Sequence, residues 1–417
     1  MEGLRAVRTV IADRGWKSRL LTARDGENLV TLSLDARTGR ELWRREIQRK
    51  RSHKIYKAND AASPTAAADD KNVYAFFPDL GLVSYTFEGK ERWRHPLGPF
   101  QNYYGMASSP IVAGDLVILN CDQQAGSFLV AVDKEAGRQR WRTERPGMTI
   151  GWAVPILYER PKKQTEVIVV GSTRIDSYYL ATGERRWWVP IASEGAMGSP
   201  VIDGDTLFVH ARGHDESWMS TYEAMAAQFD LNRDGRVSRD EFRDPSWAEH
   251  FGWIDADRNE FIDPAEWNAA RSFGSGDYGL MAIRLSDTKG QLPANAVRWR
   301  VKRNLPYVPA PVFYGNVLYM VRSGGIITSI DPGSGELLKQ GRTEKAPGEH
   351  WAQPVAADSK ILVLSEEGKL TILRAAPQWE ILAVNDLQDE SYATPAISGS
   401  AIYVRTRASL YCFAARP

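Results

Sequence analysis

The sequence predicts an all-β protein, an eight-bladed β-propeller that carries a small α-helical insertion. Three observations lead to this fold class. An apolar stretch that follows a proline recurs about every 45 residues, a Gly-x-x-x-Trp turn recurs in phase with it, and one interval in the series is too long. Repeats of this length, each holding several short strands, are typical of propeller blades.

The proline series sets the period of the repeat. Successive prolines are separated by 46, 45, 45, 111, 43 and 41 residues. The interval of 111 exceeds a 45-residue unit by 66 residues, which predicts an insertion between Pro200 and Pro311. The openings are Ser63-Pro64, Ser109-Pro110, Val154-Pro155, Ser199-Pro200, Ala310-Pro311, Gln353-Pro354 and Thr394-Pro395.

Each unit then continues through a strand of alternating apolar and polar residues and a turn, and ends at a tryptophan. In the turn, the aspartate bonds its own backbone and the glycine supplies a positive φ. A large ring at a fixed place in each blade is suited to packing against the neighbouring blade. Later units drift, with Lys339 in the tryptophan position and Trp379 after a turn without glycine. The pairs are Gly39 with Trp43, Gly89 with Trp93, Gly137 with Trp141, and Gly183 with Trp187.

Seven proline openings and one unit before Pro64 give eight blades. The last unit shows only three strands, and we expect the stretch from Leu4 to Ile11 to supply the fourth and close the ring. Because the first unit is short, seven blades are also compatible with the sequence. The predicted domains are N-terminal blades over residues 1–212, an insert over 213–275, and C-terminal blades with the ring closure over 276–417.

The insertion contains DLNRDGRVSRDE, residues 230–241, which has the spacing of an EF-hand calcium loop. Such a loop offers oxygen ligands from fixed positions, and Gly235 stands where the sharp turn needs a glycine. The predicted ligands are Asp230, Asn232, Asp234, the Arg236 main-chain carbonyl, Ser238 directly or through water, and Glu241.

A second loop, DADRNEFIDPAE, follows over residues 255–266. Glu260 replaces the turn glycine, so we expect a left-handed backbone there and weaker calcium binding. Val237 and Ile262 should pair the two loops. The predicted ligands are Asp255, Asp257, Asn259, the Phe261 carbonyl, Asp263 and Glu266.

Two interpretations of the insertion stay open beside this one. Acidic surface loops can bind nothing, although a tandem of two such loops disfavours that alternative. Bound calcium would either stabilise the insert or gate the docking of a partner. Both ends of the insert join one blade, which favours the stabilising role.

The repeats resemble the β-propeller family named for pyrroloquinoline quinone, which includes quinoprotein alcohol dehydrogenases and the outer-membrane assembly propeller lipoprotein. Stretches such as LDARTGRELW carry the resemblance. GPFQNYYGMASSP and LPYVPAPVFYGNVLYMV are similar to a bacterial subgroup with an EF-hand pair between blades. The resemblance implies a periplasmic or other extracytoplasmic location, although the N-terminus lacks the apolar stretch of a secretory signal.

The resemblance also raises a quinone-dependent alternative. Dehydrogenases of the family hold the quinone under a disulfide of adjacent cysteines, whereas Cys121 and Cys412 are far apart in this sequence. We therefore expect calcium and not pyrroloquinoline quinone as the cofactor. The alternative function is a quinone-dependent dehydrogenase with its site at the central funnel.

The funnel is the remaining candidate site. Residues just before each proline should ring one end of the channel, where they either line a pocket or plug a narrow opening. The candidates are Asn59, Tyr104, Trp152, Glu194, Tyr307, His350, Trp351, Glu390 and Tyr392.

Composition narrows the partner class. The net charge of +1 argues against a nucleic-acid partner, and no segment approaches the ~20 apolar residues of a membrane span. The sequence thus predicts a non-catalytic binding or scaffolding propeller for a protein, peptide or small-molecule ligand.

Overall fold

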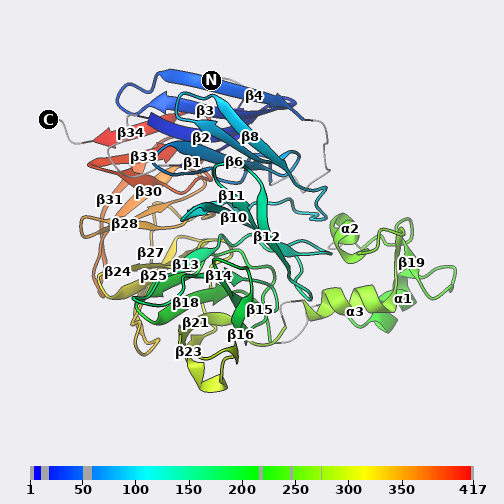
Figure 1. The fold of residues 1–417 in the computed structure, drawn as a ribbon. Coiled ribbons are helices and arrows are strands. Elements are labelled where there is room, and N and C mark those ends of the chain that lie inside the picture. Colours follow the sequence, from blue (N-terminus) through cyan, green and yellow to red (C-terminus); the bar gives the residue numbers. More distant parts are fainter. Residues whose placement is uncertain are drawn as a thin grey trace.

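The computed structural model describes residues 4–10, 18–49, 59–215, 219–244, 248–273 and 275–414. These residues form eight blade sheets around a ring, with only three short α-helices among them (Figure 1). The eight-bladed propeller is confirmed, and the alternative of seven blades is wrong.

The first four blades follow the proline repeat in chain order. Blade 1 holds β1 (Leu4–Val10), β2 (Ser18–Asp25), β3 (Asn28–Asp35) and β4 (Glu41–Gln48); blade 2 holds β5 (Ala67–Ala68), β6 (Asn72–Phe77), β7 (Gly81–Thr86) and β8 (Glu91–Pro96); blade 3 holds β9 (Ile111–Ala113), β10 (Leu116–Cys121), β11 (Phe128–Asp133) and β12 (Gln139–Glu144); blade 4 holds β13 (Ile156–Tyr158), β14 (Glu166–Val170), β15 (Arg174–Tyr179) and β16 (Arg185–Pro190), with β22 (Gly290–Gln291) beside β16.

The other four blades complete the ring. Blade 5 holds β17 (Val201–Asp203), β18 (Thr206–Ala211), β21 (Gly279–Arg284) and β23 (Val297–Val301); blade 6 holds β24 (Val312–Tyr314), β25 (Val317–Arg322), β26 (Ile326–Ile330) and β27 (Leu337–Arg342); blade 7 holds β28 (Val355–Ala357), β29 (Lys360–Leu364), β30 (Lys369–Arg374) and β31 (Glu380–Asp386); blade 8 holds β32 (Ala396–Ser398), β33 (Ala401–Arg405) and β34 (Leu410–Ala414).

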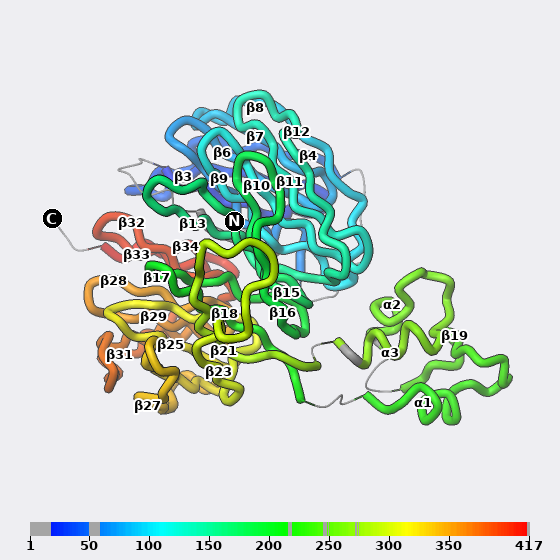
Figure 2. The backbone as a smooth tube through the Cα atoms, turned by 60° about the horizontal axis from the view of Figure 1, so that its bottom comes forward, coloured from blue at the N-terminus to red at the C-terminus, as the bar shows by residue number. Residues whose placement is uncertain are grey.

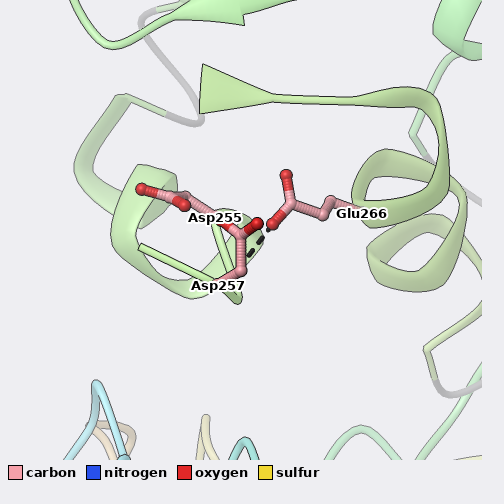
Figure 3. A group of neighbouring side chains, drawn as sticks. All are labelled: Asp255, Asp257 and Glu266. Carbon is pink, nitrogen blue, oxygen red and sulfur yellow. Dashed lines mark hydrogen bonds between the residues drawn. The ribbon is translucent and has the colours of Figure 1, made fainter. Parts of the chain in front are cut away.

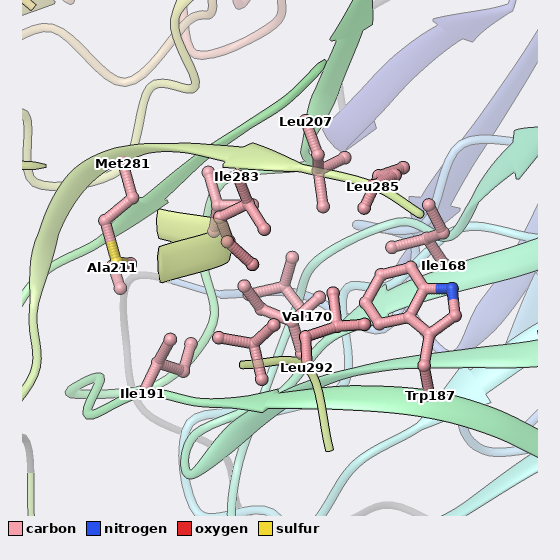
Figure 4. Packing of buried hydrophobic residues seen from close by; sticks show 14 of the residues in the cluster. Ile168, Val170, Trp187, Ile191, Leu207, Ala211, Met281, Ile283, Leu285 and Leu292 are labelled. Carbon is pink, nitrogen blue, oxygen red and sulfur yellow. The ribbon is translucent and has the colours of Figure 1, made fainter. Parts of the chain in front are cut away.

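Burial changes from the middle of each blade to its edge. Strand β10, LVILNC, is buried along its whole length because neighbouring blades cover both faces of the sheet. Strand β12, at the outer edge, buries Trp141 and exposes most of its other residues. The core therefore lies between blades, as in the cluster shared by blades 4 and 5 that contains Ile168, Trp187 and Leu207 (Figure 4).

The recurrent tryptophans pack between blades, as predicted. The ring of Trp141 lies against Gly183 of the next blade, and its indole nitrogen donates to the Leu180 carbonyl at 3.0 Å. The same arrangement joins Trp43 to Gly89, Trp93 to Gly137 and Trp299 to Gly335. Each glycine has a positive φ and leaves room for the ring.

The drift in the later units has a structural reason. At the contact of blades 6 and 7 the tryptophan comes from the second blade of the pair. Trp379 packs back into the cluster that contains Val317 and Tyr319 of blade 6. Lys339 occupies the usual tryptophan position, and its ammonium lies 4.5 Å from the centre of the Trp379 ring.

The predicted ring closure is wrong. Strand β1 pairs with β2 as the innermost strand of blade 1, while blade 8 has three strands among the described residues. Ile11 lies outside those residues. The short connection from β1 to β2 favours local pairing over a strand in the last blade. Side chains close the ring instead, since Arg19 donates to the Tyr403 hydroxyl at 2.8 Å and lies over its ring.

The insertion leaves the propeller inside blade 5 and not between two blades. It connects β18, which ends at Ala211, to β21, which begins at Gly279, and these strands pair with each other. Residues 219–244 and 248–273 stand outside the ring as a separate small lobe (Figure 2). We call this segment the inserted lobe.

Candidate functional site

The inserted lobe is built from two helix-loop units that pair through a short sheet. Its elements are α1 (Tyr222–Phe229), β19 (Val237–Ser238), η1 (Ala248–His250), α2 (Phe251–Ile254), β20 (Phe261–Ile262) and α3 (Pro264–Ser272). Thr221 caps α1, and Asp263 forms a reciprocal capping box with Glu266 at the start of α3. Phe242, Phe251 and Trp267 lie in its own buried core.

The two acidic loops fold alike. Val237 pairs with Ile262, so the predicted pairing of the loops is confirmed. In the first loop, the Asp230 carboxylate accepts from the amides of Asp234 at 3.2 Å and Gly235 at 3.0 Å. Glu241 accepts from the Ser238 hydroxyl at 2.7 Å and from the Ser238 amide at 2.9 Å. The loop therefore turns the carboxylate oxygens of Asp230 and Glu241 towards its own backbone amides.

The second loop draws three carboxylates together. One oxygen from each of Asp255, Asp257 and Glu266 lies within 4.8 Å of the others (Figure 3). Asp255 accepts from the Asn259 amide at 3.1 Å and from the Glu260 amide at 3.2 Å. Burial raises the pKa of both Asp255 and Glu266, because each charge is partly withdrawn from water. A cation among these carboxylates would offset that cost.

Glu260 adopts the left-handed backbone that its position requires. Its φ is +67°, close to the +84° of Gly235 in the first loop. The conformation is held by an ion pair between the Glu260 carboxylate and Arg239, and by a bond from the Arg239 amide to the Glu260 carbonyl at 3.1 Å. The expected backbone is confirmed, and Glu260 points to Arg239 rather than to the carboxylate cluster.

The remaining predicted ligands lie on the same loops. The Arg236 amide donates to Asp234 at 2.9 Å, and the Phe261 amide donates to Asn259 at 2.8 Å. The guanidinium of Arg236 lies 4.3 Å from the centre of the Phe261 ring and so links the loops. Asn232 accepts from the Asp234 amide at 2.8 Å, and Asp263 accepts from the Glu266 amide at 2.8 Å.

The lobe touches the propeller away from its own blade. The Tyr104 hydroxyl lies 2.9 Å from Nδ1 of His250, at the start of α2. The Gln124 side chain forms a bridge, because its nitrogen donates to the Trp253 carbonyl at 3.3 Å and its oxygen accepts from the Tyr103 amide at 3.1 Å. An element inserted in blade 5 thus rests on the loop between blades 2 and 3.

Tyr104 also belongs to the predicted funnel rim. Its carbonyl accepts from Asn59 at 2.7 Å, and its ring packs edge-on against Trp152 with centroids 6.0 Å apart. The Trp152 indole donates to the Gly105 carbonyl at 2.7 Å and lies over Gly195, the neighbour of Glu194. The structure therefore brings Asn59, Tyr104 and Trp152 together.

A second arc of the rim runs through blades 5 to 8. Glu194 pairs with Arg212 at 3.3 Å, and Arg212 lies 4.5 Å from the centre of the Tyr307 ring. Tyr307 packs edge-on against Trp351 at 6.0 Å. The arc ends at Glu366, which accepts from the Trp351 indole at 2.7 Å and from the Tyr392 hydroxyl at 2.8 Å.

Arg212 and Glu366 were missed by the sequence prediction. Both follow the second strand of a blade, β18 and β29. Because strands alternate in direction, the turn after the second strand lies at the same end of the blade as the residues that lead into the first. That rule would have placed both residues, and the inserted lobe, at the rim.

Two predicted rim residues, His350 and Glu390, form none of these contacts of the two arcs. His350 is only 1% exposed, and its Nδ1 lies 3.0 Å from the Gly348 carbonyl. Burial lowers its pKa, which favours the uncharged form of this buried side chain. Glu390 is exposed and forms an ion pair with Arg407 at 2.6 Å.

Two cavities lie near other residues of blades 1 to 4, and the first is lined by Asp60 and Gly105, the chain neighbours of Asn59 and Tyr104. One of about 20 Å³ is lined by Arg49, Asp79 and Met106 among others. Another of about 290 Å³ lies beside Ser127, Arg145 and Met148. Predicted rim residues line neither cavity. Among the helices of the described residues, none has the length and apolarity needed to cross a membrane.

Comparison with known proteins gives one family match. The model of the family described as outer membrane protein assembly factor BamB matches residues 24–258 and 273–416. The match omits residues 1–23, residues 259–272 within the inserted lobe, and the last residue. None of the curated proteins matches the chain.

Several solved structures share the fold. BamB from Moraxella catarrhalis is similar with a TM-score of 0.55 and 13% identity, covering 98% of this chain and 97% of that one. The computationally designed Ika8 protein gives 0.58 and 11%, with coverages of 100% and 98%. Quinohemoprotein alcohol dehydrogenase from Comamonas testosteroni gives 0.55 and 11%, with coverages of 96% and 72%. At these identities the similarity shows the fold alone.

Proposed function

The chain belongs to the family of the outer membrane protein assembly factor BamB, and on that premise we propose that it is a non-catalytic binding or scaffolding propeller. Its partner is a protein that docks on the funnel rim, and its location is extracytoplasmic, in keeping with the outer membrane named in the family description. The inserted lobe binds calcium and supports one side of the rim.

The continuous contacts of the rim carry this proposal. Tyr307 and Tyr392 are 41% and 52% exposed, yet each is fixed by a neighbour, Trp351 and Glu366 respectively. Tyrosine, tryptophan and arginine are enriched at the centres of protein interfaces, where fixed rings give contact area at a small entropic cost. The rim combines these residue types in one connected surface.

Calcium fits the donor set of the inserted lobe. Carboxylates, amide oxygens and main-chain carbonyls are the ligands that this hard cation takes, and each loop offers them in the order of an EF-hand. Bound calcium would neutralise the clustered charges of Asp255, Asp257 and Glu266. The loops would then hold α2 against Tyr104 and Gln124 at the rim.

Calorimetric titration of the metal-free protein with calcium tests the lobe. We expect two sites per chain, with Glu241→Gln and Glu266→Gln each removing one. Glu260→Gln is the matched control, because this carboxylate lies in the second loop but pairs with Arg239. A protein that takes up no calcium, or that loses both sites in the control, would contradict the assignment.

The partner proposal needs its own test. In cells that express the protein, we expect cross-linking through the rim to recover outer-membrane proteins, and Tyr307→Ala to weaken that recovery. Leu337→Ala is the control, since this exposed residue lies on the outer strand β27. A saturable calorimetric signal with pyrroloquinoline quinone and calcium, near one per chain, would instead favour the dehydrogenase alternative.

A further inference from the structure

Blade 8 differs from the other blades at its outer edge. Within the described residues its sheet has three strands, so the third strand, β34, has no fourth strand beside it. Third strands such as β7, β11 and β26 are buried along most of their length. In β34, by contrast, Cys412, Phe413 and Ala414 are exposed. An apolar third strand therefore lies open at the surface.

The register shows which residue a fourth strand would cover. In each of blades 1 to 5, the residue opposite the tryptophan of the fourth strand is a fully or almost fully buried serine or alanine. These pairs are Ser33 with Trp43, Ser84 with Trp93, Ala131 with Trp141, Ser177 with Trp187 and Ala282 with Trp299. On the second strand, each small residue faces a large side chain, as Ser84 faces Tyr74. Cys412 faces Tyr403 in the same way, so it is the small residue of blade 8.

Within the described part of the chain, the space beside blade 1 that such a tryptophan would fill, which we call the socket, is also open. Gly89, Gly137, Gly183 and Gly335 each lie against a tryptophan of the preceding blade, so a Cβ on any of them would clash with the ring. Gly39 is the equivalent glycine of blade 1, which follows blade 8 around the ring. Its φ is +70°, like that of the others, but no heavy atom of the described chain comes within 4 Å of a Cβ built there. The open edge and the open socket lie on the same blade-to-blade contact.

The backbone of β34 is arranged to receive a strand. At the end of the β33–β34 hairpin, the Thr406 amide donates to the Ser409 carbonyl at 2.9 Å. Alternation along an antiparallel ladder then directs the amide and carbonyl groups of Leu410, Cys412 and Ala414 away from β33. These groups face the open edge, where an added strand would pair with them.

We propose that this edge binds an extended strand of a partner polypeptide that carries a tryptophan followed by an arginine. The tryptophan would lie opposite Cys412 and enter the socket at Gly39. The next residue would fall on the other face, beside the stacked rings of Tyr411 and Phe413, whose centroids are 5.9 Å apart. An arginine is suited to that aromatic surface.

The occupant follows from continuity with the contacts between the other blades. The fourth strands of this chain repeatedly place arginine after tryptophan, as in Trp43-Arg44, Trp93-Arg94, Trp141-Arg142 and Trp299-Arg300. A partner strand of this pattern would make at blade 8 the contact that the chain already makes between its own blades. This surface is separate from the rim and from the inserted lobe, so its test is independent of the proposed function.

Thiol labelling gives a direct readout. Cys412 is exposed and Cys121 is buried, and the sequence contains no other cysteine. The probe is a synthetic peptide copying residues 40–48, RELWRREIQ, and the control peptide replaces its tryptophan with alanine. We expect the first peptide to slow the reaction of native protein with a disulfide-based thiol reagent several-fold and saturably, while the control peptide does not.

A pair of protein variants checks the socket. Gly39→Leu fills it and should abolish protection by the peptide. Gly26→Leu is the matched control, because Gly26 also has a positive φ and open space around it but lies in the turn between β2 and β3. Thermal unfolding confirms that both variants are folded.

Several results would overturn the proposal. Equal protection by both peptides, no protection by either, or unchanged protection of Gly39→Leu would each do so. If Cys412 of the monomer is unreactive without any peptide, the chain itself covers the edge. A thiol that becomes unreactive as the protein dimerises would show that a second copy occupies it.

Discussion

The indole ring of Trp93 in blade 2 lies against Gly137 in blade 3, so closely that a Cβ on this glycine would come within 2.6 Å of the ring. The Trp93 nitrogen donates to the Lys134 carbonyl at 3.0 Å, three residues before that glycine. The glycine and the tryptophan of one motif therefore take part in two different blade-to-blade contacts. The glycine of each blade receives the tryptophan of the blade before it.

This arrangement predicts unequal costs for the same substitution at two equivalent glycines. Gly39→Ala should destabilise the protein by about 1–2 kcal/mol, the cost of a Cβ on a left-handed backbone. Gly137→Ala carries that cost and should add about 1–3 kcal/mol, because the methyl group overpacks the Trp93 ring. Urea unfolding of both variants measures the difference, and equal losses would contradict the packing role.

A buried ion network between blades 3 and 4 gives a second prediction. Arg145 is fully buried, and its guanidinium bonds to Asp122 at 2.7 Å and to Asp176 at 3.0 Å. Arg145→Met should therefore cost about 3–5 kcal/mol, since two buried carboxylates lose their cation.

The control for Arg145 lies in the same blade. Arg140 pairs with Asp115 and Asp133 at the surface, with half of its side chain exposed. Arg140→Met should cost at most about 1 kcal/mol, because water screens exposed ion pairs. Comparable unfolding free energies for the two variants would refute the importance of the buried network.

The repeat made much of the fold predictable from sequence. Period, blade number and the packing role of the tryptophans are local properties that recur, so a single chain displays each of them several times. The role of Leu4–Val10 was not predictable in the same way. An alternating strand suits either the inner edge of blade 1 or the outer edge of blade 8, and only the three-dimensional pairing decides between them.

The candidate site was predictable to a similar extent. The loop pairing of Val237 with Ile262 follows from spacing, because both residues hold the eighth position of a twelve-residue acidic loop. The contact of Gln124 with Trp253 joins residues 129 positions apart and leaves no local pattern. Arg212 and Glu366 were missed because the proline openings mark only one of the two segments that each blade sends to the rim.

A buried histidine predicts how stability depends on pH. Burial, with a contribution from Arg212, lowers the pKa of His210 from its usual 6.5 to about 4. The unfolded chain therefore takes up a proton at a higher pH than the folded chain. Stability should be greatest above pH 6.5 and should fall as the pH drops towards 4, by on the order of 3 kcal/mol.

The variant His210→Leu isolates this effect. It replaces the titrating imidazole with an apolar side chain of similar size, so most of the decline in stability between pH 6.5 and 4 should disappear. His350, whose pKa is also lowered by burial, should account for part of the decline that remains. Urea unfolding across this pH range measures it, and an unchanged slope in the variant would assign the decline to other groups.

The Gln124 bridge predicts how far the effect of calcium reaches. Its side chain joins the Trp253 carbonyl of the inserted lobe to the Tyr103 amide of the rim loop. If calcium holds α2 in place, its removal should release this bridge and speed hydrogen exchange at the Tyr103 amide roughly fivefold, as expected for the loss of about 1 kcal/mol. The opposite side of the rim, around Trp351, should be unaffected because its contacts run through Glu366.

In the control variant Gln124→Ala, hydrogen exchange at the Tyr103 amide should be fast with or without calcium. If exchange at Tyr103 in the unaltered protein does not depend on calcium, the inserted lobe is not coupled to the rim. A change in exchange confined to residues 101–105 would show that calcium acts on the surface where we place the partner.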